Sequence, residues 1–345
     1  MHRLRIFPIL RAVSVVCCAW LTVLASFAQQ KIMLVGSGSN VPVHLYQAWV
    51  DEFNKKNPEV QVQYLPLGTS QSIQQVSEGS GDFGGGEVPL TTEQMHGHKI
   101  SLKQIPTVLV GIVPIYNLPG KMGLNFSGDL LAQIYLGTVK SWKDPKIAKL
   151  NPDAKLPDMP ISVVHRSSGK GSNYIFTDFL SKTNAEFRTQ VGKGASPRWP
   201  VGSEANRGED MVARVASTPG AIGYVELNFA RNAGIGYGRV QNAAGHFVRA
   251  TPDTIDAACR AAEKSINDTF QVSMTNAPGK DSYPIASFTW IYVPTSGTNA
   301  TRSRALQQFL EWSLHDGQTM AVAMGYAVLP SKVAAAARSA VKSLQ

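Results

Sequence analysis

The residues best suited to binding a ligand are gathered most densely between Val163 and Asp178. There an apolar run leads to Arg166, then to Ser, Gly and Lys residues, and then to aromatic and aliphatic residues at helical spacing. This order predicts a strand, a glycine-rich turn and a helix start, whose unpaired N–H groups attract anions. With Arg166 and Lys170 beside it, the turn is a candidate oxyanion site. An ordinary solvated loop is an equally good interpretation of this stretch alone.

Two further corners of the same kind occur near the N-terminus. The run Gly-Ser-Gly-Ser-Asn at 36–40 follows a short apolar strand and precedes a helix that starts near Pro42. The run Gly-Thr-Ser-Gln-Ser at 68–72 follows an alternating strand and leads into a polar helix near Ile73–Glu78. Three such corners in a basic chain predict a shared anion cage. Glu87 lies in a glycine-rich loop, and taken by itself it is best interpreted as a solvent-facing charge.

The first 28 residues have the composition of a secretory signal peptide. They carry three arginines and no acid, then an apolar stretch at 12–25, and small residues around a predicted cleavage after Ala28. We therefore expect a periplasmic location. The remaining chain has a net charge of +6 and a single cysteine, Cys259, so no internal disulfide is possible. This moderate excess suits an anionic ligand and is too diffuse to argue for nucleic acid.

About 317 residues remain after the predicted cleavage, more than one core usually holds, so two lobes are expected. The nearly continuous apolar stretch Ile105–Pro114 predicts a strand covered on both faces, which leaves the first lobe and enters the second. Ser287–Val293 predicts a second buried strand that carries the chain back. The predicted organisation is a signal peptide at 1–28, lobe 1 at 29–109 and 287–345, and lobe 2 at 110–286.

Several motifs, taken together, resemble the periplasmic phosphate-binding proteins of phosphate-specific ABC importers. They are V-V-H-R-S-S-G-K-G-S-N-Y-I-F-T-D-F-L, I-P-T-V-L-V-G-I-V-P, L-A-Q-I-Y-L-G-T-V-K-S-W-K-D-P-K-I-A-K-L-N-P and P-G-A-I-G-Y-V-E, in a chain that is similar from about Lys31 onward. The resemblance implies a two-lobed α/β periplasmic-binding-protein fold of the Venus-flytrap type. In this fold each lobe is a mixed sheet flanked by helices, and the lobes close on one phosphate about a hinge.

By position in these motifs, the resemblance implies a phosphate site made of Asn40, Val41, Thr69, Glu87, Arg166, Lys170, Gly171 and Ser172. Asn40 stands where the family has a threonine that supplies a side-chain donor, and Val41 is expected to offer its backbone N–H. Thr69 stands where a serine hydroxyl is usual. Glu87 stands where an aspartate accepts the proton of phosphate, and Arg166 matches the family arginine.

The chain departs from the family pattern next to Arg166. The family motif Asp-Gly-Ser-Gly-Thr is here Ser168-Gly169-Lys170-Gly171-Ser172, so an acidic partner of the arginine is lost and an ammonium replaces a hydroxyl. We expect Glu87 to preserve a preference for phosphate over sulfate, which has no proton to donate, through a salt bridge with Lys170.

The sequence offers little support for catalysis. The lysine of Gly-Lys-Gly-Ser at 169–172 is followed by Gly rather than Ser or Thr, so the motif is not a nucleotide P-loop, and the chain has no G-x-S-x-G motif. His96 and His98 flank a glycine, but no nearby cysteine or acidic cluster completes a zinc site. His165 is interpreted as a residue on the strand face opposite Arg166.

The sequence thus predicts a monomeric phosphate receptor that is not an enzyme and has no metal or cofactor. Its predicted partners are inorganic phosphate and an inner-membrane ABC permease and ATPase. Two alternatives remain open: a receptor for another oxyanion such as sulfate or arsenate, and a stand-alone phosphate sensor or scavenger.

Overall fold

The computed structural model describes residues 31–96, 99–120, 123–296 and 299–344. The predicted signal peptide and His98 lie outside these described residues. The chain from Ile32 onward forms one compact unit in which helices cover a large mixed sheet.

The N-terminal part alternates strands with helices. β1 runs parallel to both β2 and β3, which places the segments after all three strands at the same edge of the sheet. α1 forms because Leu45, Trp49 and Phe53 recur every fourth position, and all three side chains are buried against the sheet. The elements here are β1 (Ile32–Gly38), α1 (Val43–Lys56), β2 (Val60–Leu65), α2 (Thr69–Ser77), β3 (Phe83–Gly86) and α3 (Thr92–His96).

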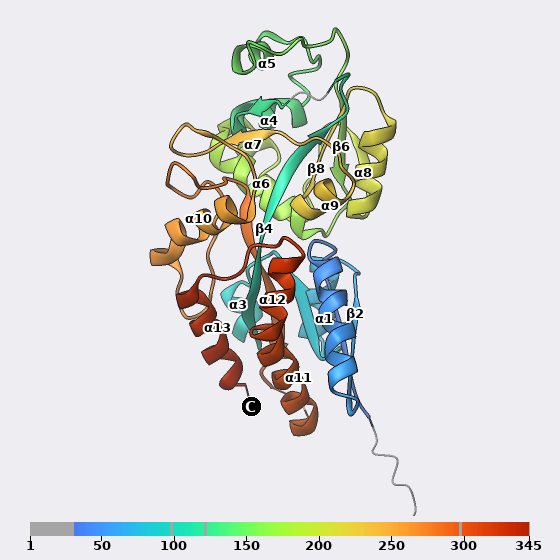
Figure 1. The fold of residues 1–345 in the computed structure, drawn as a ribbon, viewed down its shortest axis with the longest axis vertical. Coiled ribbons are helices and arrows are strands. Elements are labelled where there is room, and N and C mark those ends of the chain that lie inside the picture. The colour runs from blue at the N-terminus through green and yellow to red at the C-terminus, as the bar shows by residue number, and fades with distance from the viewer. Residues whose placement is uncertain (1–30, 97–98, 121–122, 297–298, 345) are drawn as a thin grey trace, which may run out of the picture. The chain divides into compact units, whose positions relative to one another are not determined.

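One long strand, β4 (Leu102–Tyr116), is common to both halves of the eight-stranded sheet (Figure 1). Its first part, through Gly111, pairs antiparallel with β11 (Ala286–Pro294), and from Ile112 it pairs antiparallel with β8 (Ala221–Glu226). The strand order is β2-β1-β3-β11-β4-β8-β6-β7. All residues of β8 and β11 are buried, and in β4 only Lys103 is partly exposed, as a strand covered on both faces requires.

The second half of the sheet contains β8, β6 and β7, and a separate three-stranded sheet has the order β10-β9-β5. The elements are β5 (Asn125–Phe126), α4 (Gly128–Tyr135), α5 (Pro145–Leu150), β6 (Ser162–Arg166), α6 (Gly171–Thr183), α7 (Ala185–Gln190), β7 (Ser203–Ala205), α8 (Gly208–Ser217), α9 (Leu227–Asn232), β9 (Arg239–Gln241), β10 (Phe247–Val248), α10 (Pro252–Ala262) and the short 3-10 turn Glu263–Ser265.

The last helices return to the first half of the sheet. They are α11 (Ala300–Ser313), α12 (Asp316–Ala323) and α13 (Ser331–Lys342). Phe309 of α11 packs edge-on against Phe53 of α1 with 5.1 Å between ring centroids, and the Trp49 indole donates to the Gly317 carbonyl in α12. The predicted lobe boundaries remain a prediction.

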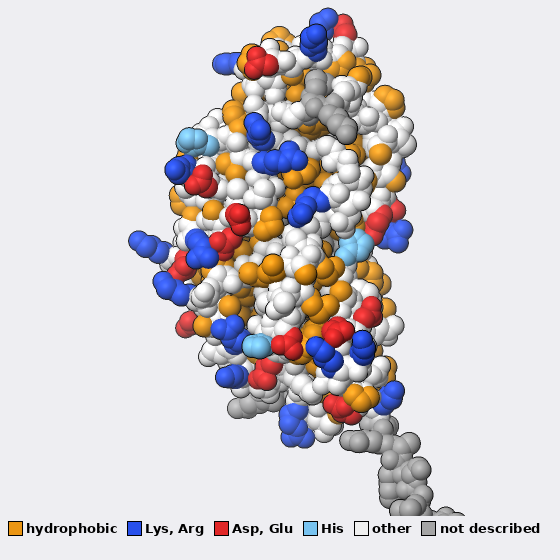
Figure 2. Space-filling model, viewed as in Figure 1, with side chains coloured by type: hydrophobic (Ala, Val, Ile, Leu, Met, Phe, Trp, Pro, Cys, Tyr) orange, Lys and Arg blue, Asp and Glu red, His pale blue; other side chains and the backbone are white. Residues whose placement is uncertain are grey.

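The surface carries both signs of charge. Figure 2 shows lysine and arginine side chains interspersed with aspartate and glutamate on the face in view. Within the described ranges, no helix has the length and apolar character needed to cross a bilayer.

Candidate functional site

Three of the helices that start without a side-chain cap directly follow strands β1, β2 and β6 of the main sheet. They are α1, α2 and α6, whose N-cap residues are Pro42, Gly68 and Lys170. Elsewhere Ser127, Asn184 and Asn299 cap the helices that follow them. The first N–H groups of a helix have no intrahelical acceptor, so an uncapped start presents donors and a partial positive charge.

The starts of α2 and α6 meet each other and the loop that carries Glu87. The Ser70 N–H donates to the Gly169 carbonyl at 3.1 Å. Gly171 is so close to this loop that an added Cβ would overlap the Glu87 carboxylate and lie 2.7 Å from the Thr69 hydroxyl oxygen. Two predicted corners, distant in sequence, therefore form one site with Glu87 between them. The Ser70 amide is thus engaged within the protein.

Arg166 ends β6 and is buried beneath this junction, with 3% of its surface exposed. Its Nε donates to the Ala205 carbonyl at 3.2 Å, its Nη2 to the Asn206 carbonyl at 2.8 Å, and its Nη1 to the Ser172 hydroxyl at 3.4 Å. These carbonyls orient the guanidinium in place of the missing aspartate at position 168. Three of its five N–H donors are used, so one on each terminal nitrogen is left for a ligand.

Lys170 points inward. It is 9% exposed, and its Nζ would lie 3.3 Å from a Cβ on Gly68, so its side chain spans from the start of α6 to the start of α2. Burial, and then the charge of Arg166, lower the pKa of the ammonium from its ordinary value. The expected salt bridge between Lys170 and Glu87 is wrong: the described residues form no such ion pair, because the side chain is directed toward Gly68.

Glu87 is fully buried, so its interpretation as a solvent-facing charge is wrong. Its Oε2 accepts a hydrogen bond from the Thr69 hydroxyl at 3.3 Å, while its Oε1 is buried without a partner. Burial raises the pKa of this carboxyl to about 7, while the nearby Ser39 hydroxyl, the Thr69 hydroxyl and the charge of Arg166 oppose the rise. A buried carboxyl with one unpaired oxygen pays a desolvation cost when it is ionised, which favours the protonated form.

Asn40 and Val41, after β1, are buried beside the site, and each makes a hydrogen bond within the protein. The Asn40 Nδ2 donates to the Pro66 carbonyl at 3.1 Å, and its Oδ1 is buried without a partner. One N–H of the Asn40 Nδ2 and the whole of Oδ1 are therefore left without a partner among the described residues, so the expectation that Asn40 supplies a side-chain donor to the ligand stays a prediction. The Val41 N–H is also engaged, because it donates to the Ser39 hydroxyl at 3.0 Å.

The sequence analysis missed Ser39, whose hydroxyl binds the Val41 amide and influences the Glu87 pKa. A serine inside a glycine-rich turn gives no pattern that would single it out. His165 is buried and stacks on Trp199 with 5.5 Å between ring centroids, which agrees with its predicted place away from the ligand face.

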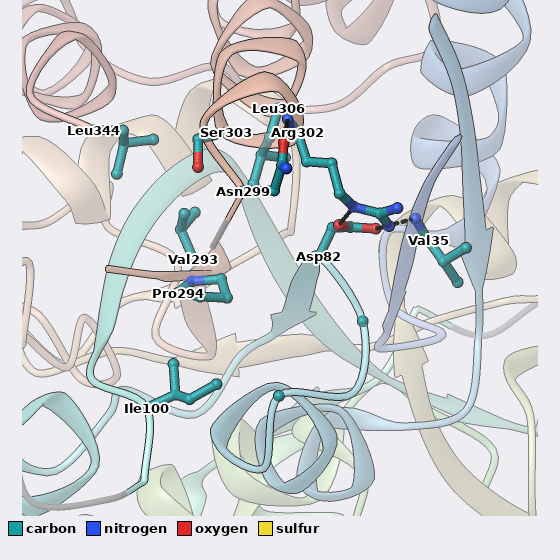
Figure 3. Close-up of a pocket in the computed structure, with 12 residues that line it drawn as sticks. Val35, Asp82, Ile100, Val293, Pro294, Asn299, Arg302, Ser303, Leu306 and Leu344 are labelled. Carbon is teal, nitrogen blue, oxygen red and sulfur yellow. Dashed lines mark hydrogen bonds and ion pairs between the residues drawn. The ribbon is translucent and has the colours of Figure 1, made fainter. Parts of the chain in front are cut away.

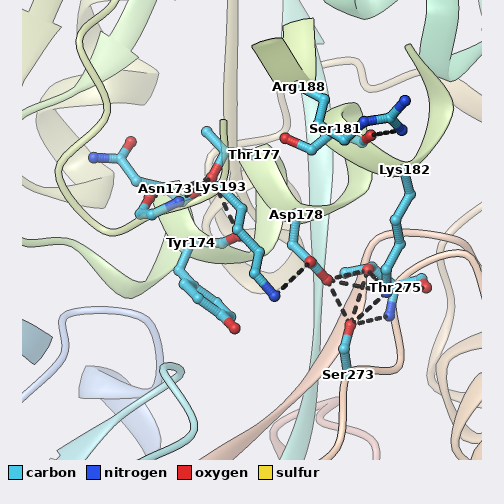
Figure 4. Close-up of polar contacts among 11 residues, drawn as sticks. Asn173, Tyr174, Thr177, Asp178, Ser181, Lys182, Arg188, Lys193, Ser273 and Thr275 are labelled. Atoms are coloured by element: carbon cyan, nitrogen blue, oxygen red, sulfur yellow. Dashed lines mark hydrogen bonds and ion pairs between the residues drawn. The ribbon is translucent and has the colours of Figure 1, made fainter. Parts of the chain in front are cut away.

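The body of α6 is fastened by a second polar cluster (Figure 4). The buried Asp178 carboxylate accepts hydrogen bonds from the Ser273 and Thr275 hydroxyls, both at 2.5 Å, and pairs with Lys182 at 3.1 Å. Lys193 lies 3.7 Å from the other carboxylate oxygen. These contacts tie α6 to the segment Asn267–Thr275, which precedes β11.

The same segment also contacts the first half of the molecule. Gln271 donates to the Leu90 carbonyl at 2.7 Å, and the Thr269 carbonyl accepts from Gln104 of β4 at the same distance. Leu90 lies three residues after Glu87. We call Asn267–Thr275 the strap, since it connects the loop of Glu87 with the helix that begins at Gly171.

A cavity of about 480 Å³ lies away from this site (Figure 3). Its polar centre is the pair formed by Asp82 and Arg302, whose Nη2 lies 2.6 Å from the carboxylate, and Asp82 also accepts from the Val35 N–H at 2.7 Å. The pair is thus satisfied within the protein. Among the described residues, no cluster of His, Cys, Asp and Glu side chains could hold a metal ion.

A family model of the PBP superfamily domain matches residues 25–316, most of the chain. The fold and the site between its two halves define a two-lobed α/β binding protein of the periplasmic-binding-protein type, as the sequence predicted. Phosphate-binding protein PstS of Pasteurella multocida is 33% identical over 306 residues, which cover 88% of each chain. The PstS of Haemophilus influenzae is 33% identical over 317 residues, which cover 91% of this chain and 93% of that relative. The chain belongs to this family of phosphate-binding proteins.

Solved structures agree with the fold. A high affinity periplasmic phosphate-binding protein bound with phosphate matches with a TM-score of 0.70 and 19% identity, over 89% of this chain and 93% of its own. An ABC-type phosphate transport receptor from Vibrio cholerae matches with a TM-score of 0.58 and 18% identity, over 86% and 100%. At these identities the likeness concerns the fold alone.

Proposed function

We propose that this protein captures inorganic phosphate between its two lobes and delivers it to an ABC importer. The observation that carries the proposal is the meeting of two uncapped helix starts with a buried arginine. Such a junction offers backbone donors, helix dipoles and a guanidinium, which are the groups that bind a small oxyanion. Relatives that share a third of the sequence over most of its length are named phosphate-binding proteins, which supports the same ligand.

In this proposal, Arg166 supplies the fixed charge and Lys170 a second one. The amides of Gly171 and Ser172, the first residues of α6, donate to the anion because neither has an intrahelical acceptor. From the other half of the site, the Thr69 hydroxyl and the Val41 amide can donate to the anion once they release Glu87 and the Ser39 hydroxyl, which accept from them in the described structure. Glu87 distinguishes protonated phosphate from sulfate, because a buried carboxylate repels an anion that has no proton to share.

The ligand enters by opening of the lobes, which we assign to 29–109 with 287–345, and to 110–286. The described structure joins the Ser70 N–H to the Gly169 carbonyl and brings Lys170 close to Gly68, so we assign it to the closed form, and opening separates both contacts. Phosphate favours closure only by the contacts that it makes better in the closed form than in the open form.

The remaining assignments follow from this role. The protein works as a monomer in the periplasm after removal of residues 1–28, and its partners are the permease and ATPase of the importer. It performs no catalysis and uses no cofactor.

Isothermal titration with phosphate, arsenate and sulfate tests the ligand. We expect tight binding of phosphate, similar binding of arsenate, which has the same protonation, and much weaker binding of sulfate. Sulfate binding as tight as phosphate binding would contradict the role of Glu87, and the absence of phosphate binding would contradict the proposed function.

A further inference from the structure

We propose that the Asn40 side chain accepts a hydrogen bond from the bound anion. The closed complex then contains two protons on phosphate and Glu87, each of which forms a hydrogen bond within the site. This inference rests on the proposed function and deepens it, because it specifies the protonation state that the site takes. One proton lies between phosphate and Glu87, and the other lies on the phosphate oxygen that faces Asn40.

The orientation of the Asn40 amide is determined by its neighbour. The Pro66 carbonyl can only accept a hydrogen bond, so the Asn40 atom 3.1 Å from it must be the NH₂ nitrogen. The carbonyl oxygen Oδ1 is then left buried and without a partner. Buried polar atoms are nearly always paired in folded proteins, and an unpaired one beside a binding site indicates a group of the ligand.

A second unpaired acceptor, the Glu87 Oε1, lies in the same site. Asn40 and Glu87 lie near each other, because the hydroxyl of Ser39, which precedes Asn40, is close enough to the Glu87 carboxyl to lower its pKa. Both unpaired oxygens call for a hydrogen-bond donor. Arg166, Lys170 and the amides of α6 can only donate, so they satisfy the unprotonated oxygens of the ligand and leave these two acceptors to its O–H groups.

The possible ligands differ in how many O–H groups they can offer to these two acceptors. Sulfate has no O–H group, and the dianion of phosphate has one, which satisfies one acceptor. The monoanion of phosphate has two and satisfies both when Glu87 is ionised. The dianion together with a protonated Glu87 contains the same two protons, so the two descriptions are one complex.

Other ionisable groups face Glu87 from the surrounding elements. Arg166 lies at the end of β6, and the buried Glu226 lies at the end of β8. Three buried tyrosines approach from α1, β2 and β11, and burial raises the pKa of each well above its ordinary value, so they stay neutral: Tyr46, Tyr64 and Tyr292. Lys170 completes the set from the start of α6. Glu226 also titrates near neutral pH, so the test needs a variant that changes Asn40 and keeps both carboxyls.

The test measures proton uptake during phosphate binding at pH 8.5. There the free ligand is mostly the dianion with one proton and Glu87 is mostly ionised, so a two-proton complex takes up one proton. Titration calorimetry of the full mature protein in buffers of different ionisation enthalpy should report uptake near one. The dissociation constant should rise about fivefold between pH 7.5 and pH 8.5, because free phosphate and Glu87 still hold part of the second proton at pH 7.5 and have lost most of it at pH 8.5.

The matched variant is Asn40→Thr, whose hydroxyl can donate to the anion. With a donor at position 40, only the Glu87 acceptor needs a proton, so the complex contains one proton. Proton uptake on binding at pH 8.5 should then fall to near zero, and the rise in the dissociation constant with pH should disappear. Circular dichroism establishes that the variant is folded. Uptake near zero in the unaltered protein would overturn the proposal, whatever the variant does. Uptake near one in both proteins would overturn the assignment to Asn40. Failure of the unaltered protein to bind phosphate at any pH would instead contradict the proposed function itself.

Discussion

At the scale of single residues, Arg166 is positioned before any ligand binds. Two backbone carbonyls and the Ser172 hydroxyl hold three of its N–H groups, so little side-chain freedom remains to be lost on binding. The carbonyls take the role that an acidic side chain has in the family motif. They leave the guanidinium charge uncompensated by an adjacent carboxylate, which strengthens its attraction for an anion.

Replacing Arg166 with alanine should weaken phosphate binding by at least about tenfold. The anion would lose its charge-assisted hydrogen bonds while remaining desolvated, which typically costs about 1.5–3 kcal/mol. Titration calorimetry measures the change. Arg188→Ala is the control, since that arginine lies in α7 and donates to the Ser181 carbonyl near the end of α6, far along the helix from the site at its start. An unchanged affinity for Arg166→Ala would remove Arg166 from the site.

Gly171 is a residue whose smallness matters because of a close approach. A Cβ there would overlap the Glu87 carboxylate, so Gly171→Ala should oppose closure and weaken phosphate binding by about tenfold to hundredfold. Gly194→Ala is the matched control, because its Cβ would lie 3.9 Å from the Ser196 nitrogen, its nearest neighbour outside the adjoining residues. The melting temperature of each ligand-free variant should stay close to that of the parent. Equal affinities of the two variants would contradict the described junction.

At the scale of elements, the sequence predicted strands and helices well where the burial pattern is strong. The apolar stretch Ile105–Pro114 lies within β4, and Ser287–Val293 lies within β11. The predicted positions of helix starts were less accurate. The polar helix predicted near Ile73–Glu78 begins at Thr69, and the prediction missed its first turn because the residues from Thr69 to Ser72 show no hydrophobic periodicity. Local pattern determines an element, but its ends depend on partners from other elements.

The turns that carry the candidate site were recognisable in the sequence, whereas the orientation of their side chains was not. The corners at Thr69 and Gly171 are recognisable as turns before helices, and the structure brings them together with Glu87. The direction of the Asn40 amide depends on the Pro66 carbonyl, and that of Lys170 on the space beside Gly68. Such pairings arise only in the folded chain, so sequence pattern could not supply them.

Helix α6 depends on its buried anchor at Asp178. Removing the carboxylate by Asp178→Ala would leave the Ser273 and Thr275 hydroxyls and the Lys182 ammonium without their acceptor, which should lower the free energy of unfolding by about 2 kcal/mol. Denaturant unfolding measures the loss. Asp158→Ala, which removes an exposed pair with Lys143, should change stability by less than about 0.5 kcal/mol. Equal losses in the two variants would contradict a structural role for the Asp178 cluster.

At the scale of the whole molecule, buried carboxyls couple stability to pH. Burial raises the pKa of Glu87 to about 7 and that of Glu226 to about 8, from the ordinary 4.5. The folded state therefore binds protons that the unfolded state has released. The stabilisation is fully present below pH 4.5 and is lost as pH rises through these values. For Asp178, burial tends to raise the pKa, but hydrogen bonds from Ser273 and Thr275 and the Lys182 charge lower it overall, so its contribution is lost only in more acidic solution.

The ligand-free protein should therefore lose a few kcal/mol of unfolding free energy between pH 5 and pH 8. Urea unfolding at intervals of one pH unit measures this slope. Glu87→Gln removes one of the two titrating groups and should make the slope about half as steep. If the variant keeps the slope of the parent, Glu87 is not a source of the pH dependence.

The strap limits how far the two walls of the site can move apart. Its Gln271 is bound to the carbonyl of Leu90, and its Thr275 to Asp178 of α6. Four residue steps separate these points, so a fully extended chain between them reaches about 13–14 Å. While both ends stay hydrogen-bonded, the number of residues in the strap sets an upper limit on how far the site can open. A longer strap would allow a wider opening and faster ligand exchange, whereas a shorter strap would restrict the protein to small ligands.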